Sequence, residues 1–374
     1  MLVSPRLATQ PWFNFMLALL AVLAAGAPVP AQAERQEERP PPPTSEEIAA
    51  MAEKAENAPL FASHEVLVVS LEADMEDLKK ERDQDIEREG TFTFMGPDNE
   101  PMTVSVKLTT RGIFRLDKRN CNFPPLKLDL PKGKVEGTIF NGQNKLKLVA
   151  PCNDQKDDYQ RYVLLEYLVY RTYNLITPVS YRVRLLHCTF KDSSGKNDDR
   201  TMYVFLIEDV DRLAERNFAE ESDWEEFHPY NMQDRQAALV DLFQYMIGNT
   251  DWSAPYFHNI KMILGEGLTY LVIPFDFDFS GAVDASYATP NPDVGIRRVR
   301  DRAYRGFCRE SLDFTTLFAL FNERRDSIYA TVRGLEELEE KQRDRLLDYY
   351  DKFYDVINNE GRARREIHRM CRRV

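Results

Sequence analysis

The chain has 374 residues, of which 43% are hydrophobic, and its 61 Asp and Glu against 49 Lys and Arg give a formal net charge of −12. This acidic balance argues against nucleic acid as the main partner. The hydrophobic content is that of an ordinary folded protein, and the length suits a chain with two folded parts.

The first residues indicate export. An uncharged apolar run, MLALLAVLAAGA, follows Arg6 and leads to Ala31-Gln32-Ala33, which has small residues at the two positions that a signal peptidase reads. This predicts a signal peptide over residues 1–33, cleaved after Ala33, and a mature chain that is secreted or periplasmic. A retained anchor is the alternative, but the run is shorter than a membrane-spanning helix needs. We expect no stable membrane span after cleavage, because no later segment is apolar for long enough.

Residues 34–60 are rich in Pro and Glu and carry almost no large apolar side chain. A segment of this composition cannot bury a core, so it predicts a disordered tether with at most one short helix.

The next part of the chain alternates apolar and polar residues in short runs, which predicts strands. A β-branched run and a charged helical segment come first, and a hairpin around the turn GPDNE and two further strands follow. The expected strands are residues 64–71, 90–94, 101–112, 125–130 and 145–151. We expect a largely antiparallel sheet.

The helical pattern begins with an amphipathic helix that starts with acids at Asp157 and ends near Asn174. Strands are expected over residues 179–190 and 201–209, a helix over 234–247, and mainly helical chain from Ser311 onward. A β-rich part followed by an α-rich part predicts an α+β protein with a cleft between them.

The five cysteines stand far apart and none has the spacing of a metal site, so a zinc site is not expected. Export permits disulfides, and Cys121 with Cys152 is the expected bridge. The odd count leaves at least one thiol free.

The stretch GNTDWSAPYFHNIKMILGEGLTYLVIPFDFDFSG places acids among large apolar residues around an apparent hairpin. If FDFDF continues as a strand, Asp276 and Asp278 share one face and the three phenylalanines share the other. Two adjacent carboxylates repel, and a divalent ion would hold them together; oxygen ligands suit magnesium or manganese. Asn259 adds a neutral oxygen, and Asp251 is placed to act as a base, so the set matches the parts of a phosphoryl-transfer site.

Each of these residues also has an ordinary structural interpretation. Asp251 is able to cap the segment after it, and Asp276 and Asp278 are able to face outward from an edge strand. His258 is expected to be a structural hydrogen-bonding residue. The arginines between residues 297 and 305 suit a solvated loop or a contact to an acidic or phosphorylated substrate.

The order of five motifs resembles that of the secreted spore coat protein H (CotH) family; the motifs are RGIFRLDKRNCNFPPLKLDL, LKLVAPCND, YVFLIEDVDRL, GNTDWSAPYFHNIKMI and PFDFDFSG. The resemblance implies a two-lobed protein-kinase-like fold with a β-rich N-terminal lobe and a mainly helical C-terminal lobe. It also implies transfer of phosphate from ATP, with Mg or Mn, to a hydroxyl of a secreted protein substrate. With the signal peptide and the tether, the expected division of the chain is 1–33, 34–60, 61–210 and 211–374.

The resemblance also implies roles for single residues. Asp251 would be the catalytic base, Asn259 and Asp276 the metal ligands, and Asp278 a second carboxylate. Glu166 would pair with a lysine that steadies the nucleotide phosphates. The match of PPLKLDL favours Lys127 for that lysine, whereas its place on the strand before the helix favours Lys145 or Lys147.

One motif departs from the family. The arginine–glycine motif, usually followed by asparagine and tryptophan, is here Arg111-Gly112-Ile113-Phe114. This departure favours the alternative function, a catalytically silent secreted protein that binds a partner or has a structural role. A metal-dependent phosphoesterase ranks last, because the chain lacks the histidine-rich ligand sets that such enzymes often use.

Overall fold

The structure is a computed structural model, and it describes residues 45–373 except 223–227, 229–230, 266–268 and 310–311. The predicted signal peptide and residues 34–44 of the predicted tether lie outside the described residues. Ser45–Glu56 forms helix α1, the short helix that the tether's composition allowed. A turn at Pro59–Phe61 then buries Leu60 and Phe61 against the strands that follow.

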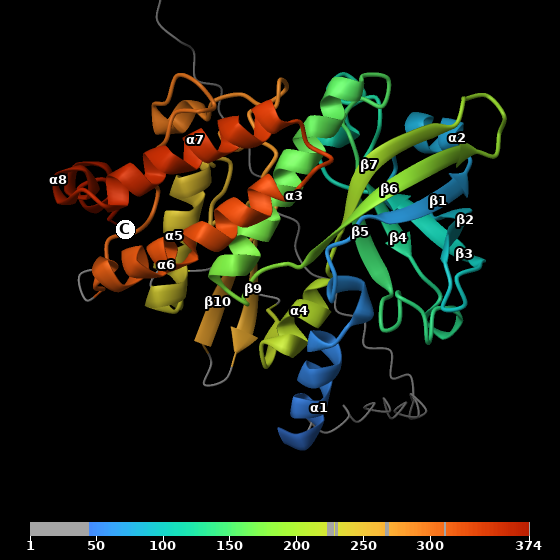
Figure 1. The fold of residues 1–374 in the computed structure, drawn as a ribbon, viewed down its shortest axis with the longest axis horizontal. Helices are drawn as coiled ribbons and strands as arrows, with labels where there is room; N and C mark the ends of the chain where they lie inside the picture. Colours follow the sequence, from blue (N-terminus) through green and yellow to red (C-terminus); the bar gives the residue numbers. More distant parts are fainter. Residues whose placement is uncertain (1–44, 223–227, 229–230, 266–268, 310–311, 374) are drawn as a thin grey trace, which may run out of the picture. The chain divides into compact units, whose positions relative to one another are not determined.

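Seven strands of the first half close into a barrel, in the order β1-β2-β3-β4-β5-β7-β6 (Figure 1). Most neighbours are antiparallel, as expected, but β1 and β6 run parallel, with Leu67 opposite Leu186, and this pair closes the barrel. The strands are β1 Leu67–Ala73, β2 Arg88–Met95, β3 Pro101–Thr110, β4 Leu126–Asp129, β5 Lys145–Val149, β6 Val183–Asp192 and β7 Arg200–Ile207. Helix α2, Met75–Lys80, follows β1.

The barrel interior follows directly from the alternation of the sequence. In β3, Val104, Val106 and Leu108 are buried while the residues between them are exposed. Since successive side chains of a strand point to opposite faces, the apolar set fills the barrel. Phe92 and Phe94 pack on Phe140 inside it, with ring centroids 5.3 and 4.7 Å away.

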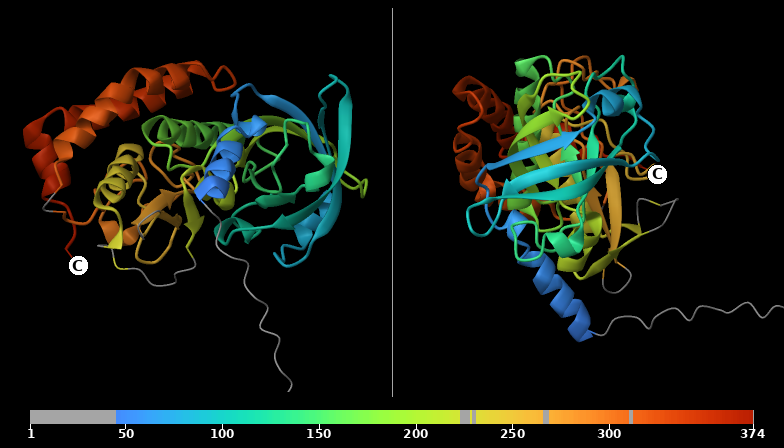
Figure 2. Two further views of the ribbon diagram at one scale, coloured as in Figure 1. Left: turned by 90° about the horizontal axis from the view of Figure 1, so that it is seen from below. Right: turned by 90° about the vertical axis from the view of Figure 1, so that its right-hand side faces the viewer.

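Helix α3, Gln160–Ile176, passes between the barrel and the C-terminal helices (Figure 1). Nearly all of its residues are buried, because it packs on β7 on one side and on α6 on the other. The left view of Figure 2 shows the barrel strands and the last helices at opposite ends. The other helices are α4 Val210–Arg216, α5 Asp234–Ile247, α6 Phe314–Arg333, α7 Glu340–Ile357 and α8 Glu360–Ala363.

A separate three-stranded sheet has the order β10-β9-β8, with β8 Ala219–Glu221, β9 Ile260–Gly265 and β10 Thr269–Pro274. β9 and β10 form the expected hairpin, with Ile260 opposite Pro274. Helix α5 has the bounds that the sequence predicted.

The prediction of a two-lobed protein-kinase-like fold with a β-rich N-terminal lobe and a helical C-terminal lobe is wrong. The structure has a closed seven-stranded mixed barrel and a separate small sheet instead. The physical reason is that alternation identifies strands but not their partners. The parallel pairing of β1 with β6 joins segments that are distant in the sequence, and no local pattern encodes it.

Cys121 and Cys152 form a disulfide, as predicted. Cys308 and Cys371 form a second one, which was not predicted, and Cys188 is a free, buried thiol. The second bridge holds the end of the chain beside the segment after Arg305, where the Cys308 N–H also donates to the carbonyl of Arg372 at 2.9 Å.

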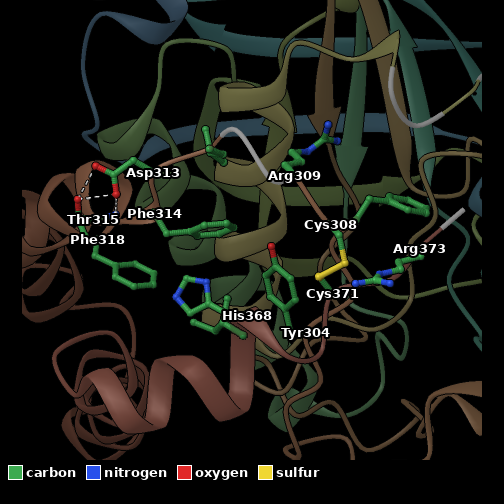
Figure 3. A pocket seen from close by; sticks show the side chains of 13 residues that line it. Tyr304, Cys308, Arg309, Asp313, Phe314, Thr315, Phe318, His368, Cys371 and Arg373 are labelled. Carbon is green, nitrogen blue, oxygen red and sulfur yellow. Dashed lines mark hydrogen bonds between the residues drawn. A yellow bond between two sulfur atoms is a disulfide. The ribbon is translucent and has the colours of Figure 1, made fainter.

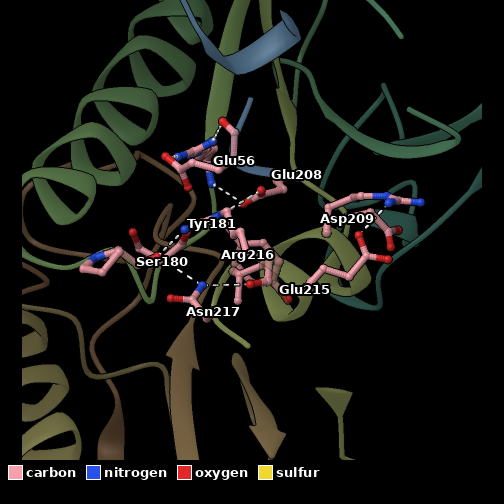
Figure 4. Close-up of polar contacts among 12 residues, drawn as sticks. Glu56, Ser180, Tyr181, Glu208, Asp209, Glu215, Arg216 and Asn217 are labelled. Atoms are coloured by element: carbon pink, nitrogen blue, oxygen red, sulfur yellow. Dashed lines mark hydrogen bonds and ion pairs between the residues drawn. The ribbon is translucent and has the colours of Figure 1, made fainter. Parts of the chain in front are cut away.

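A buried ion pair stabilises the junction of β7 and α4 (Figure 4). Glu208 and Arg216 are both almost fully buried, and Nε of Arg216 lies 2.9 Å from Oε1 of Glu208. The same guanidinium donates to the carbonyls of Pro178 and Ser180, so its burial is compensated by several hydrogen bonds.

None of the helices in the described part of the chain has both the length and the apolar character that crossing a membrane requires.

Candidate functional site

The carboxylate segment is a loop and not the strand that the alternation predicted. β10 ends at Pro274, and Asp276 has a φ of 63°, in the left-handed region. Asn259 is left-handed as well, with a φ of 52°. Non-glycine residues rarely adopt this conformation, and such residues gather at functional sites. Two of the predicted metal ligands are therefore held in unusual backbone conformations.

The three phenylalanines do not share one face, so that part of the strand prediction is wrong too. Phe275 lies edge-on to Tyr181, and Phe277 packs between Tyr170 and Phe243. Phe279 instead faces Phe114 and Tyr287. The turn at Asp276 explains the difference, because a left-handed residue interrupts the alternation of a strand.

Helix α3 fixes the position of this loop. Glu166 and Tyr170 are four residues apart and lie on one face of the helix. The hydroxyl of Tyr170 accepts a hydrogen bond from the N–H of Asp276 at 2.9 Å, and Oε1 of Glu166 accepts one from the N–H of Phe277 at 3.2 Å. Consecutive backbone groups of the loop are thus bound to one helix.

Three carboxyl groups gather around this loop. Burial, followed by the charge of Asp276, raises the pKa of Asp278 to about 7. Burial and the charges of Asp278 and Asp276 raise the pKa of Glu166 well above its usual range. Tyr287 donates to Oδ2 of Asp278 at 3.0 Å. The three acids thus disfavour one another's ionisation, Arg115 opposes part of this effect, and a bound cation would favour the ionised forms further.

Asp251 lies in the loop before β9 and interacts with two residues of the same loop, His258 and Asn259. Its Oδ1 is 3.0 Å from Nε2 of His258, and its Oδ2 accepts from Nδ2 of Asn259 at 3.1 Å. The N–H of Phe275 donates to the carbonyl of Asn259 at 3.1 Å, which holds this segment beside the carboxylate loop, and the charge of Asp251 contributes to the raised pKa of Asp278. Because the amide nitrogen of Asn259 is directed to Asp251, its side-chain oxygen is directed elsewhere.

Basic side chains lie on the barrel side of the site. Burial lowers the pKa of Arg111, and the charges of Asp276 and Glu166 offset part of that shift. The charge of Arg115 lowers the pKa of Glu166 and of Asp278. Burial, and then the charge of Arg111, lowers the pKa of Lys147 to about 8. The Lys147 ammonium lies 5.2 Å from the ring centroid of Phe275.

The three candidate lysines have different positions. Lys127 of β4 pairs in register with Lys147 of β5, and both charges act on Asp209. Lys145 lies opposite Asp129 in the register of β4 and β5, and its side chain is exposed. Of the three, Lys147 lies closest to the loop, as its contact with Phe275 and its interaction with Asp276 show. Two arginines interact with the charge of Glu166: Arg111, and Arg115, to which the sequence assigned no role.

Two arginines of the run after the loop, Arg302 and Arg305, have a structural role. Arg302 donates to the carbonyls of Met246 and Tyr349 and lies over the ring of Tyr349. Arg305 donates to the carbonyl of Thr250 and, at 2.8 Å, to that of Trp252. Arg305 therefore holds the backbone on both sides of Asp251. The sequence contained no signal for this contact beyond the positive charge itself.

Within the described residues, no group of three or more His, Cys, Asp or Glu side chains has the arrangement of a metal site. A cation here would be held by one or two carboxylates and by Asn259. Magnesium is often bound by few protein ligands, with substrate phosphates and water completing its shell.

A cavity of about 410 Å³ lies elsewhere, beside the Cys308–Cys371 bridge (Figure 3). Its wall includes Tyr304, Phe314, Phe318 and His368. It contains none of the predicted site residues.

A comparison with protein-family models finds no model that matches the chain, and a comparison with curated proteins finds no match either. The resemblance to the CotH family thus stays a prediction from the sequence motifs.

Proposed function

We propose that the chain is an exported phosphotransferase that uses ATP and a divalent metal to phosphorylate a hydroxyl group of a secreted protein. One observation carries the proposal. Asp251, Asn259, Asp276 and Asp278 lie around one loop with Arg111, Arg115 and Lys147 beside them. The acidic side of the site suits a divalent metal, and the basic side suits the phosphates that the metal accompanies.

The residues present fit a magnesium or manganese ion. Asn259 and Asp276 would hold it, with Asp278 beside them; burial and the charge of Asp276 raise the pKa of Asp278, and a cation would lower it. When bound, such an ion neutralises charge on phosphate oxygens. Hard oxygen donors of this kind suit these two metals better than zinc.

The protein's own residues have distinct tasks in this proposal. Asp251 accepts the proton of the attacking hydroxyl, and His258 and Arg305 keep Asp251 in place. Lys147 and Arg111 bind phosphate oxygens of the nucleotide, and their positive charge stabilises the negative charge that develops during transfer. Glu166 and Tyr170 hold the loop so that these groups keep their geometry.

Export is part of the same proposal. Two disulfides suit an oxidising compartment, and the apolar run after Arg6 suits a signal peptide.

A second candidate is a catalytically silent secreted protein. Both carboxylate oxygens of Asp251 already accept hydrogen bonds, which favours a structural role for this residue. An oxygen of a carboxylate has two lone pairs, so these contacts leave Asp251 able to accept a further proton.

The two candidates are separated by calorimetry of the mature chain with MgATP and by transfer of labelled phosphate in the presence of manganese. We expect binding and transfer in the wild type. Asp276→Asn should weaken metal-dependent nucleotide binding at least about tenfold, since it removes a charged ligand. Asp301→Asn is a matched control, because it makes the same change at a carboxylate that binds the N–H and the guanidinium of Arg298 and is not a proposed metal ligand.

Binding without transfer would favour the silent protein. Absence of any heat with MgATP or MnATP in the wild type would refute the phosphotransferase.

A further inference from the structure

A second group of charged residues lies beyond Tyr162 and Tyr287, two aromatic residues beside the loop at residues 275–281. Arg161 from the start of α3, Arg300 from the arginine run and Arg345 from α7 line one small pocket with Asp284. The three arginines come from distant parts of the sequence, so the fold brings them together. None of the predicted site residues lines this pocket.

The pocket carries an excess of positive charge. Asp284 is the one acid among its lining residues, and it is shared, since Arg345 pairs with it and Nη1 of Arg300 lies 3.8 Å from it. Arg161 has a partner outside the lining, Asp158, whose Oδ1 lies 3.6 Å from its Nη1, so three arginines face two acids. Burial and the charge of Arg345 both lower the pKa of Arg300. Like charges held together in this way are unfavourable unless an anion joins them.

Two of the three arginines, Arg161 and Arg300, are held in place by aromatic rings. The Arg161 guanidinium lies 4.8 Å from the ring centroid of Tyr162 and donates to its hydroxyl at 2.9 Å. The Arg300 guanidinium lies 4.5 Å from the ring centroid of Tyr349. A guanidinium positioned by stacking loses less freedom when it binds an oxyanion.

The arginines differ in their access to solvent. The side chains of Arg345 and Arg161 are 53% and 37% exposed, whereas that of Arg300 is 24% exposed. The space enclosed among the lining residues is only about 20 Å³. A ligand must therefore bind at the mouth, where Arg345 and Arg161 are accessible and Arg300 lies behind them.

We propose that Arg161, Arg300 and Arg345 bind a phosphoryl group, either as free phosphate or on a phosphorylated protein side chain. Guanidinium groups bind phosphate oxygens in pairs, which suits three arginines around one small site. Asp284 competes with the phosphoryl group for Arg300 and Arg345. The proposal does not depend on the phosphotransferase activity, because it concerns different residues.

The site also has a route to the carboxylate loop. Tyr162 lines the pocket, and its ring packs edge-on against Tyr287, with centroids 5.9 Å apart. Tyr287 in turn donates to Asp278. A phosphoryl group in the pocket is thus separated from Asp278 by two aromatic side chains.

The test is calorimetry of the full mature chain with inorganic phosphate, with a phosphoserine peptide and with the same peptide unphosphorylated. We expect phosphate and the phosphopeptide to bind and the unphosphorylated peptide not to bind. Arg345→Gln should weaken binding about tenfold, because it removes a charge-assisted contact. Asp284→Asn should tighten binding severalfold by freeing two arginines, and Asn suits its left-handed backbone at a φ of 51°.

Two controls make the result specific. Arg369→Gln removes the same charge from an exposed position beyond the C-terminal end of α7 and should leave binding unchanged. Asp276→Asn should also leave it unchanged, which separates this site from the proposed nucleotide site. Circular dichroism checks that each variant is folded.

The outcomes are distinct. Tighter binding of the phosphopeptide than of phosphate identifies a phosphorylated protein as the source, and equal affinities identify the free anion. No binding of either probe overturns the proposal. So does equal weakening by Arg345→Gln and Arg369→Gln, no tightening in Asp284→Asn, or equal binding of the unphosphorylated peptide.

Discussion

The barrel and the loop at residues 275–281 bury their residues for different reasons. The barrel interior is apolar and regular, and its positions follow the alternation of the strands. Around the loop, Glu166 and Asp278 are 2% and 5% exposed, and Asp276 adopts a left-handed conformation. Buried acids and strained backbone lower stability unless something compensates for them. The contrast shows that apolar packing explains the burial inside the barrel but does not explain the burial of the acids at the loop.

The largest effect tests whether the two regions are equally well packed. Phe277→Ala and Phe92→Ala each remove a fully buried aromatic ring, one beside the loop and one inside the barrel. Each should lower the free energy of unfolding by about 3–5 kcal/mol. Guanidinium unfolding followed by circular dichroism measures both values. A much smaller loss for Phe277→Ala would mean that the loop is not an integral part of the core.

The second prediction compares Asp278, a buried acid beside the proposed metal, with Asp241, a buried acid for which no ligand is proposed. Burial raises the pKa of Asp278, beside Asp276, and of Asp241 in α5 to about 7 in each case. An unfolded aspartate has a pKa of about 4, so the native state binds more protons between about pH 4 and pH 7. Stability contributed by these groups is therefore lost as the pH rises through that window. Asp278→Asn and Asp241→Asn should each be more stable than wild type at pH 8, on the order of 2–4 kcal/mol, and similar to it below pH 4.

Magnesium and a non-hydrolysable ATP analogue sharpen this comparison. A cation at the loop keeps Asp278 ionised, so the contribution of Asp278 to the pH dependence should disappear. Thermal melts of Asp241→Asn across this pH range isolate the Asp278 contribution. An unchanged profile with the metal and nucleotide present would argue against a metal at the loop.

The smallest effect concerns the backbone around Asp251. Arg305→Gln removes the guanidinium that binds the carbonyls of Thr250 and Trp252, and the lost hydrogen bonds should cost about 1–3 kcal/mol of local stability. Hydrogen exchange at residues 250–252 should become faster. The control is Arg297→Gln, which changes an exposed member of the same arginine run. If both variants exchange alike, Arg305 does not hold this loop.

Much of the secondary structure could be predicted from the sequence. The helix at 234–247, the hairpin of β2 and β3 and the Cys121–Cys152 bridge all agree with local patterns. The helix and the hairpin depend on residues that are near in sequence, and the bridge joins two cysteines that lie at the ends of predicted strands. The barrel could not be predicted, because its closure depends on the pairing of distant strands.

The site shows the same division. The acids of the loop could be identified because carboxylates among apolar residues are unusual. Their geometry could not, because a left-handed turn at Asp276 leaves no sign in the alternation of FDFDF. Arg115 and Arg305 were missed for a related reason, since their roles depend on carbonyl and carboxylate groups that only the fold brings near.

The position of β1 between β2 and β6 has a consequence for synthesis of the chain. Leu67–Ala73 emerges early from the ribosome, yet its parallel partner is not complete until Asp192 has been made. Until then one edge of β1 has exposed backbone donors and acceptors, which are able to pair with another chain. Vectorial synthesis therefore leaves this edge open to aggregation, and a chaperone or rapid pairing of β1 with β6 would limit that risk.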